Sequence, residues 1–462
     1  MQRRKRTVVA LSGITAVGAL IGALVVVAAV TTPASGATVA ARGDPAGNAV
    51  SEWNLIAVNT LVNLPGPAGG APPASQINMG MTQGAVYDAV NATEPKHHRP
   101  YLLKRRFSAR ASKEAAVATA AYRVLSSIVS TVPPTIAFPS RVSLLQALAA
   151  QYAASLATIA DSPFKAQGIA AGNAAAETMI AAREGDGRFG PSQWVPNSAP
   201  GHWQPLINPA TGQPILDPTP WVGGVKPFLM QSSSQFRTAG PLPLTSAAYA
   251  AEVNEVRALG SLNSALRTAT QTYIALWWQS TPIAMWNQVG RELIARQGLD
   301  VADSARLLAM QNLAAADAHI NCWNDKYYWD FWRPWQAVRR ADEDGNPSTD
   351  PPDRTWTPLI ATPPYPEHPS GHLCNDGAHT RVLLMFFGDA PEGGFDVTSG
   401  ALNTGGPAMR HFESFSGTLA ELIEARIWLG IHFRTADVQA ERLGRSVAEY
   451  MAANYFQPVG RQ

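Results

Sequence analysis

The sequence predicts an all-α protein made of two helical bundles, and three observations support this. Apolar residues recur at helical spacing over most of the chain, whereas the apolar–polar alternation of half-buried strands is scarce. Hydrophobic residues make up 46% of the 462 residues and charged residues 15%, which supplies a sizeable core and excludes global disorder. A chain of this length suits one large helical domain or two fused bundles.

Residues 1–37 have the pattern of an export signal. Basic residues at 3–6 precede an uncharged stretch from Thr7 to Val30, and small residues follow up to Ala37. We therefore expect cleavage near Ala37 and a secreted, extracytoplasmic protein. The alternative is an uncleaved anchor, because the apolar stretch exceeds the roughly 20 residues that cross a bilayer. Such an anchor would be the only contact with a membrane.

The charge balance argues against a polyanionic partner. The formal net charge is +2, and four of the 36 basic residues lie at positions 3–6. Without residues 1–37, 32 basic side chains face 34 acidic ones, a net charge of −2. Nucleic-acid-binding proteins normally carry a basic excess, so no nucleic acid is expected as a partner.

The N-terminal half is predicted to be helical after a flexible lead-in. The lead-in covers residues 38–74 and ends in a Pro/Gly cluster at 64–74, which breaks regular structure. Residues 75–188 form the predicted helical half. Its alanine-rich stripes with helical spacing lie at 115–129, 142–160 and 166–183.

Residues 189–244 are predicted to form an irregular covering segment. The stretch is rich in proline and glycine but also contains Trp194, Trp203, Trp221 and Phe228. A stretch of this length without a helix is unusual inside a compact domain. Large aromatic side chains favour packing on the surface of the domain over a free linker.

Residues 245–462 form the predicted C-terminal helical half, which carries the candidate site. Helical periodicity covers 246–280, 283–297, 302–325, 370–387, 413–431 and 436–454. This half also contains Cys322 and Cys374. In an exported protein they can form one disulfide, and two buried free thiols are the alternative.

The first candidate motif contains two cations. Lys326 and Arg333 are seven residues apart, so on a helix they would lie about 20° apart on one face. Pro334 is expected to end that element at Arg333. Two cations on one face normally repel each other, and a shared anion between them would remove the repulsion.

The second motif is the start of a helix. A proline-rich stretch leads to Ser370, which is expected to cap a helix that begins near Gly371. Free backbone N–H groups and the helix dipole at such a terminus favour an anion, and Gly371 allows close approach. His372 in the first turn is a candidate for moving protons.

The third motif is Arg426 followed six residues later by His432. On an unbroken helix the two side chains would point about 120° apart. They converge if the helix ends near Gly430. The three motifs together supply cations, a helix N-terminus and two histidines, which is what a tetrahedral trianion needs.

This pattern of motifs, Lys-x6-Arg-Pro, Pro-Ser-Gly-His and Arg-x5-His, resembles the vanadium-dependent haloperoxidases. It also resembles their relatives, the type-2 phosphatidic acid phosphatases and bacterial acid phosphatases. The resemblance covers about residues 326–437, and a looser likeness extends back over residues 314–323. The long helical N-terminal half suits the haloperoxidases better than the short phosphatases.

The resemblance implies a fold of the vanadium haloperoxidase type and one vanadate per chain, with neither haem nor nucleotide. His432 would bind vanadium through a ring nitrogen. The vanadate oxygens would be held by Lys326, Arg333, Arg426, Ser370 and the Gly371 N–H.

The resemblance also implies roles in the reaction. His372 would act as the acid–base residue that deprotonates hydrogen peroxide, and Lys326 would polarise the bound peroxide. Trp323 and Tyr365 would line the halide pocket.

Three positions depart from the family pattern. Ala425 stands where the family often has serine. Asp437 follows His432 one position later than in the phosphatases, where an acidic residue orients the histidine. Residues 277–280 contain no aspartate of the kind that pairs with the equivalent of Arg426 in fungal chloroperoxidases.

The expected function is vanadate-dependent oxidation of a halide by hydrogen peroxide to a hypohalous species, which then reacts with a small organic acceptor. The alternative is a phosphomonoesterase of the acid phosphatase or phosphatidic acid phosphatase type. In that enzyme His432 would form a phosphohistidine and His372 would protonate the leaving group. A third interpretation is an oxyanion-binding protein without catalytic activity.

Overall fold

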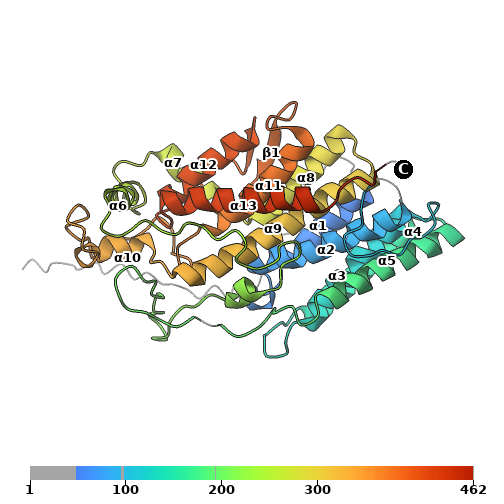
Figure 1. The fold of residues 1–462 in the computed structure, drawn as a ribbon, viewed down its shortest axis with the longest axis horizontal. Helices are drawn as coiled ribbons and strands as arrows, with labels where there is room; N and C mark the ends of the chain where they lie inside the picture. The colour runs from blue at the N-terminus through green and yellow to red at the C-terminus, as the bar shows by residue number, and fades with distance from the viewer. Residues whose placement is uncertain (1–47, 95–97, 193, 461–462) are drawn as a thin grey trace, which may run out of the picture. The chain divides into compact units, whose positions relative to one another are not determined.

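The computed structural model describes residues 48–94, 98–192 and 194–460. The predicted export signal and the first part of the predicted lead-in, up to residue 47, lie outside the described residues. Figure 1 shows an all-α fold, as the sequence predicts.

The first group of helices packs around α2, which is buried along almost its whole length. The α2 helix contacts α1, α3 and α5, and α4 packs on α3. Proline begins α2 and α5, and the Ser112 and Ser162 hydroxyls cap α3 and α5. The helices are α1 (Ala49–Val62), α2 (Pro72–Thr93), α3 (Lys113–Thr131), α4 (Arg141–Ala157) and α5 (Pro163–Ala182).

The prediction of a flexible lead-in over residues 38–74 is wrong for residues 49–62. These residues form α1, which buries Trp53 and Leu61 against the core. The Asn48 side chain accepts hydrogen bonds from the first N–H groups of the helix. The Pro/Gly cluster itself holds only the short 3-10 helix η1 (Gly66–Ala68) before α2 begins.

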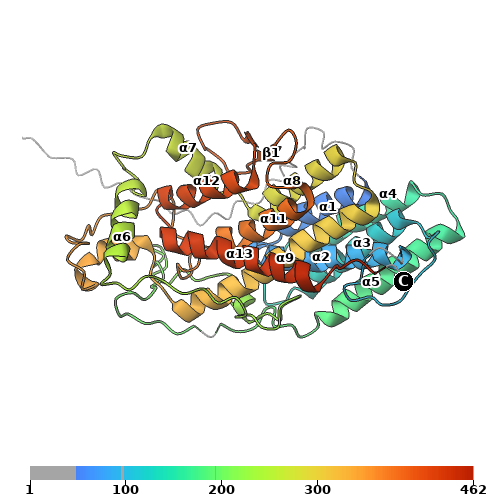
Figure 2. The same ribbon diagram turned by 45° about the horizontal axis from the view of Figure 1, so that its top comes forward.

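The second group of helices surrounds α9, the longest helix of the described chain. The α9 helix packs against α2, α11 and α13, so it belongs to both bundles (Figures 1 and 2). Its buried residues include alanines at 314–316 and 318, which allow neighbouring helices to approach closely. The longer helices of this group are α8 (Pro282–Gln297), α9 (Val301–Trp329), α11 (Gly371–Phe387), α12 (Phe415–Trp428) and α13 (Arg434–Asn454).

Two features of this half differ from the prediction. The expected helix over 246–280 is broken into α6 (Ala247–Leu259) and α7 (Ala269–Trp277), and Arg267 donates to the backbone carbonyls of Leu259 and Ser261 in the intervening turn. Short elements that the sequence did not indicate also occur. They are α10 (Pro334–Arg339), η3 (Ala341–Glu343), and the antiparallel strands β1 (Phe395–Thr398) and β2 (Met409–Phe412), paired with Phe395 opposite Phe412.

The covering segment, residues 189–244, contains only the 3-10 helix η2 (Pro220–Gly224) within its described part and is fixed by a polar row on α9. Asp317, Asn321 and Asp325 are spaced by four residues, so they share one helix face. Their side-chain oxygens accept hydrogen bonds of 2.7–2.8 Å from the backbone N–H groups of Phe228, Leu229, Met230, Phe236 and Thr238. The segment therefore lies along α9 in a defined conformation.

Within residues 48–94, 98–192 and 194–460, no helix has both the length and the apolar character needed to cross a bilayer.

Candidate active site

The first motif does not occupy one helix face, contrary to the prediction. The α9 helix ends at Trp329, and Asp330 adopts the left-handed conformation with φ 47° that closes it. Arg333 follows at the N-cap position of α10, with Pro334 as the first helical residue. The turn at Asp330, and not Pro334, therefore ends the α9 helix. This turn brings Lys326 and Arg333 into one buried region.

The Lys326 ammonium is fully buried and directs its N–H groups at the loop before α11. Nζ donates to the carbonyls of Pro366 at 3.2 Å and Glu367 at 3.1 Å, and also to that of Pro369. Burial is the main cause that lowers the pKa of Lys326 to about 8, and the charge of Arg333 acts in the same direction. Lys326 thus holds the loop and supplies a charge that titrates near neutrality.

Arg333 is also fully buried, and one of its nitrogens has no partner. Nε donates to the Tyr365 carbonyl at 3.0 Å, and Nη1 donates to the Ile431 carbonyl at 2.8 Å. Nη1 also lies 3.2 Å from His432 Nε2, whereas Nη2 is buried without a hydrogen-bond partner. Burial lowers the pKa of Arg333 to about 10, so the guanidinium stays charged at neutral pH.

His432 lies between α12 and α13, where Gly430 has a φ of 76° that ends the first helix as predicted. Its Nδ1 lies 2.8 Å from Glu367 Oε1. Because Arg333 can only donate, the Nε2 that it contacts is the acceptor, and Nδ1 carries the proton and donates it to Glu367. Burial and the surrounding cations hold the pKa of His432 well below 6.5, so the ring is neutral.

Glu367 is a site residue that the sequence analysis missed. Its Oε1 also accepts from the Phe433 N–H at 3.0 Å, and burial raises the pKa of Glu367 to about 8. The orienting contact to His432 therefore comes from Glu367, not from the acidic residue Asp437. The sequence feature that could have indicated Glu367 is its position as the single acidic residue inside the proline-rich motif, directly before His368.

The N-terminus of α11 supplies the second motif. Ser370 occupies the predicted N-cap position, but its side chain makes no capping hydrogen bond. A Cβ on Gly371 would lie 3.1 Å and 3.2 Å from ring atoms of Trp323, so only glycine fits here without moving that ring. The His372 Nε2 is buried without a hydrogen-bond partner in the described structure, and burial holds the pKa of His372 well below 6.5.

Arg426 on α12 is nearly buried, and its Nε has no hydrogen-bond partner. The negative charges of Asp437 and Asp376 favour the charged form of Arg426, and these residues take the place of the aspartate that is missing from residues 277–280. Burial raises the pKa of Asp437 well above 3.8, and its carboxylate faces the Ser370 hydroxyl without a hydrogen bond of good geometry. Burial likewise raises the pKa of Asp376 to about 8.

The three motifs converge on one region. The charges of Arg333, Arg426 and Lys326 all lower the pKa of His432, as does His372, although burial is the larger cause. Several buried polar atoms there make no well-formed hydrogen bond within the described structure: Arg333 Nη2, Arg426 Nε, Ser370 Oγ, His372 Nε2 and the two Asp437 carboxylate oxygens. Buried polar atoms are nearly always paired, so the donors among them, on Arg333, Arg426 and Ser370, fit a tetrahedral oxyanion such as vanadate or phosphate.

The two predicted halide-pocket residues border the cationic region. The rings of Trp323 and Tyr365 lie 5.1 Å apart between centroids. Lys326 Nζ lies 5.5 Å from the Trp323 ring centroid and 5.2 Å from that of Tyr365. Arg333 Cζ is 5.1 Å from the Tyr365 ring centroid, so this tyrosine faces both cations.

The two cysteines are free thiols in the structure. Cys322 on α9 and Cys374 on α11 are both buried, and burial, followed by the contact with Cys322, raises the pKa of the Cys374 thiol. Of the two alternatives that the sequence left open, the structure therefore has the pair of buried thiols.

Comparisons with known proteins match the part of the chain that contains this site. Residues 306–460 match the family model of the VCPO second helical-bundle domain. The vanadium chloroperoxidase of Curvularia inaequalis is 28% identical over 232 residues, which cover 38% of this chain and 37% of that protein. The aligned part thus spans little more than a third of this relative.

The fold has solved counterparts. A bacterial vanadium-dependent iodoperoxidase matches with a TM-score of 0.68 and 20% identity over 89% of this chain and 97% of its own. The holo form of a bacterial vanadium-dependent chloroperoxidase matches with a TM-score of 0.63 and 15% identity, covering 85% of this chain and 92% of its own. At these identities the structures show a shared fold. Together with the matched domain, they show that residues 306–460 are similar to the second helical-bundle domain of the vanadium chloroperoxidases and that the described chain shares the fold of vanadium-dependent haloperoxidases.

Proposed function

We propose that this protein is a vanadate-dependent haloperoxidase that oxidises halide with hydrogen peroxide to a hypohalous species. The observation that carries the proposal is the cluster of buried, unpaired polar atoms on Arg333, Ser370, His372 and Arg426 beside the neutral His432. Bound vanadate would supply a Lewis-acidic centre that activates peroxide without changing its own oxidation state. The relatives with the same fold carry haloperoxidase names.

His432 is suited to bind the central atom of the oxyanion. Its proton is on Nδ1 and is donated to Glu367, so the Nε2 lone pair faces the cationic region. A carboxylate behind a ligating histidine fixes the tautomer and raises the basicity of the ring. Arg333 and Arg426, with the Ser370 hydroxyl and the Gly371 N–H, would hold the oxygens.

His372 is suited to take the proton from hydrogen peroxide. Its ring is neutral because burial and the charge of Arg426 hold its pKa well below 6.5. Its Nε2 is buried without a hydrogen-bond partner in the described structure, so this nitrogen is available to act as a base. Lys326 would add positive charge next to the peroxide oxygens, provided that one of its N–H groups leaves a loop carbonyl.

The alternative proposal is a phosphomonoesterase that uses the same residues. The Glu367–His432 pair, which would present a ligating nitrogen to vanadium, would equally present a nucleophilic nitrogen to phosphorus. Aromatic side chains at Trp323 and Tyr365, beside the cations, favour the haloperoxidase because they provide a weakly polar place for a halide.

The test uses the full chain loaded with vanadate. We expect peroxide-dependent halogenation of monochlorodimedone with at least one of chloride, bromide and iodide. His372→Ala should lower the rate at least a hundredfold, whereas His411→Ala, a change at an exposed histidine paired with Asp396, should leave it unchanged. Absence of halogenation with all three halides, combined with hydrolysis of a chromogenic phosphate ester by vanadium-free protein, would replace the first proposal by the second.

A further inference from the structure

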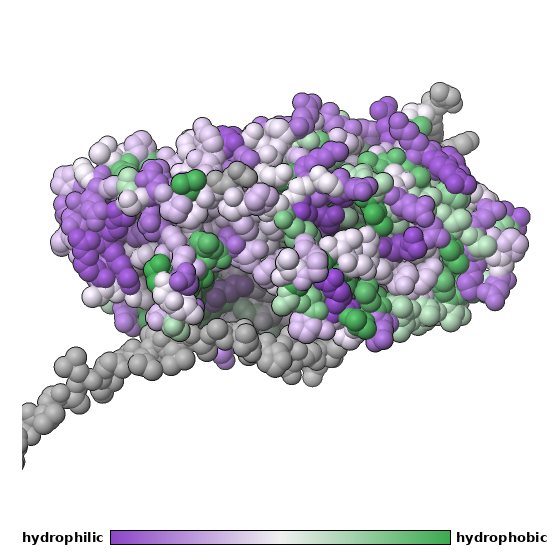
Figure 3. Space-filling view, turned by 90° about the horizontal axis from the view of Figure 1, so that it is seen from below, coloured by the Kyte–Doolittle hydropathy of each residue, from purple (hydrophilic) through white to green (hydrophobic). Residues whose placement is uncertain are grey.

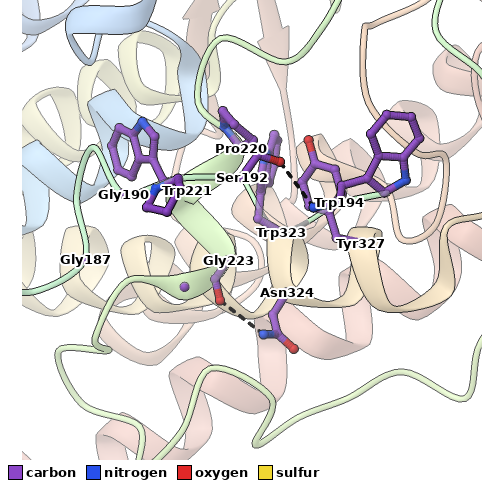
Figure 4. Close-up of a pocket in the computed structure, with 12 residues that line it drawn as sticks. Gly187, Gly190, Ser192, Trp194, Pro220, Trp221, Gly223, Trp323, Asn324 and Tyr327 are labelled. Atoms are coloured by element: carbon purple, nitrogen blue, oxygen red, sulfur yellow. Dashed lines mark hydrogen bonds between the residues drawn. The ribbon is translucent and has the colours of Figure 1, made fainter. Parts of the chain in front are cut away.

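A cavity with Trp323 in its wall lies beside the candidate active site. It has a volume of about 410 Å³ and opens between α9 and the covering segment around η2 (Figure 4). Figure 3 views the molecule from below relative to Figure 1 and shows a hollow in this face of the surface. Small-molecule sites commonly have volumes of roughly 300–1,000 Å³.

The walls of the cavity are aromatic and uncharged. Trp194 and Trp221 come from the covering segment, whereas Trp323 and Tyr327 come from α9, one turn apart (Figure 4). Four of the other lining residues are glycines, which leave the ring faces uncovered. None of the side chains that line the cavity in the described structure is acidic or basic, so the cavity favours an uncharged, flat ligand.

The rings are held in place before any ligand binds. A single carboxylate oxygen, Asp217 Oδ2, accepts from Trp323 Nε1 and from the Tyr327 hydroxyl, both at 2.8 Å. Trp194 Nε1 donates to Asp330 Oδ1 at 2.7 Å, at the residue that closes α9. Rigid walls of this kind reduce the ordering that binding requires.

Trp323 is the wall that the cavity shares with the candidate active site. The same ring that faces the cavity packs against Gly371 and lies 5.5 Å from Lys326 Nζ. It also contacts the ring of Tyr365, 5.1 Å away between centroids. A molecule in the cavity would therefore lie one indole ring away from the place where oxidised halide is expected to form.

We propose that this cavity binds the organic acceptor, and that the acceptor is an uncharged, electron-rich aromatic compound such as an indole or a phenol. The proposal rests on the proposed haloperoxidase function, which supplies the hypohalous acid. The ring carbon of the acceptor forms a bond to the halogen as the halogen–oxygen bond breaks. The hydroxide that leaves combines with the proton lost from the same carbon, which gives the aryl halide and water.

Gly224 allows a direct test of the cavity. It lines the cavity, has no positive φ, and a Cβ at this position would meet nothing within 4 Å. Gly224→Phe should therefore fill the cavity without a backbone clash, and Gly224→Val should fill it partly. Gly460→Phe is the matched control, because Gly460 also faces open space but does not line the cavity.

The first arm measures binding of indole to vanadium-free protein by calorimetry. We expect the dissociation constant to rise at least tenfold in Gly224→Phe, by less in Gly224→Val, and not at all in Gly460→Phe. Equal affinity of Gly224→Phe and the unmodified chain for indole, or no binding to the unmodified chain at millimolar indole, would overturn the proposal. This arm does not depend on halide oxidation.

The second arm compares two reactions of the vanadate-loaded chain. In Gly224→Phe, halogenation of indole should fall at least tenfold relative to the oxidation of iodide to triiodide. A fall of both reactions by the same factor would count against the cavity. If no halide is oxidised by the unmodified chain while indole still binds in the first arm, the proposed function fails and the aromatic binding site remains.

Discussion

At the scale of single residues, the site is organised around the protonation of His432. Two neighbours determine it: Arg333 requires an acceptor at Nε2, and Glu367 Oε1 accepts a hydrogen bond from Nδ1–H. Neither neighbour is close to His432 in the sequence. The ligand role proposed for His432 therefore depends on side chains from two other segments of the chain.

The contact between Glu367 and His432 can be tested by Glu367→Gln. The amide keeps the shape but can turn its NH2 group toward Nδ1 in place of the acceptor oxygen, which weakens the contact that fixes the His432 tautomer, so we expect vanadate affinity to fall 10- to 100-fold with little loss of fold. Vanadate binding followed by ultraviolet difference spectroscopy gives the measurement. Glu292→Gln is the control, because Glu292 accepts from the Asp396 N–H away from the site. Unchanged affinity in Glu367→Gln would show that the contact does not orient the ligand.

The pKa values of two site residues predict how anion binding depends on pH. Lys326 has a pKa of about 8 and loses its positive charge as the pH rises through that value. Glu367, also near 8, gains negative charge over the same range. Both changes disfavour the binding of an anion. Sulfate stays doubly charged in this range, so its affinity should fall above pH 8 by up to about tenfold per pH unit for each of the two groups. Lys326→Met should bind more weakly with a flatter profile, and a constant dissociation constant between pH 7 and 9 in the unmodified chain would contradict the prediction.

The glycine at the start of α11 gives a third test at this scale. In Gly371→Ala the new methyl group would meet the Trp323 ring at 3.1–3.2 Å, so the ring or the helix terminus must shift. We expect anion affinity to fall several-fold and the tryptophan fluorescence spectrum to move. Gly66→Ala, where the nearest atom is Pro218 Cβ at 3.9 Å, should change neither quantity.

At the scale of elements, α9 has three roles along its length. Its alanine-rich middle packs between the two bundles, its end carries Lys326, and its polar row fixes the covering segment. Asp317 alone accepts three backbone N–H groups, those of Phe228, Leu229 and Met230. The segment that carries the cavity wall is therefore held by side chains of the helix that carries the site.

Asp317→Ala should release this part of the covering segment. Three buried N–H groups would lose their partner, at about 1–3 kcal/mol for each group that water does not reach, so we expect a loss of several kcal/mol of stability. Hydrogen exchange of residues 226–238, together with urea unfolding, gives the measurement. Asp303→Ala, at an exposed position on the same helix, should leave both unchanged. Unaltered exchange in Asp317→Ala would show that the row does not hold the segment.

At the scale of the whole molecule, the candidate site connects elements that are far apart in the sequence. Its residues come from α9, the turn before α10, the start of α11, the end of α12 and the link to α13. Three buried cations lie close together there, and the neighbouring carboxylates neutralise their positive charge only in part. An anion bound among them would favour the folded state by relieving their mutual repulsion.

Vanadate should therefore stabilise the chain against unfolding. At a free concentration 100 times the dissociation constant, binding to the native state adds about 2.7 kcal/mol to the apparent free energy of unfolding. The midpoint of thermal unfolding should rise with vanadate concentration in the unmodified chain and stay constant in His432→Ala. An equal rise in both proteins would place the binding elsewhere.

The sequence by itself determined the helical class, most helix positions and the residues that make up the three motifs. These features follow from local patterns: apolar spacing specifies helix faces, Gly430 ends α12, and Ser370 marks the start of α11. The tertiary structure decided what no local pattern encodes. Examples are the end of α9 at Asp330, the buried helix α1, the contact of Glu367 with His432, and the hold of α9 on the covering segment. Each depends on which distant backbone or side-chain group can satisfy a polar atom that folding removes from water, and such partners are fixed only when the elements pack.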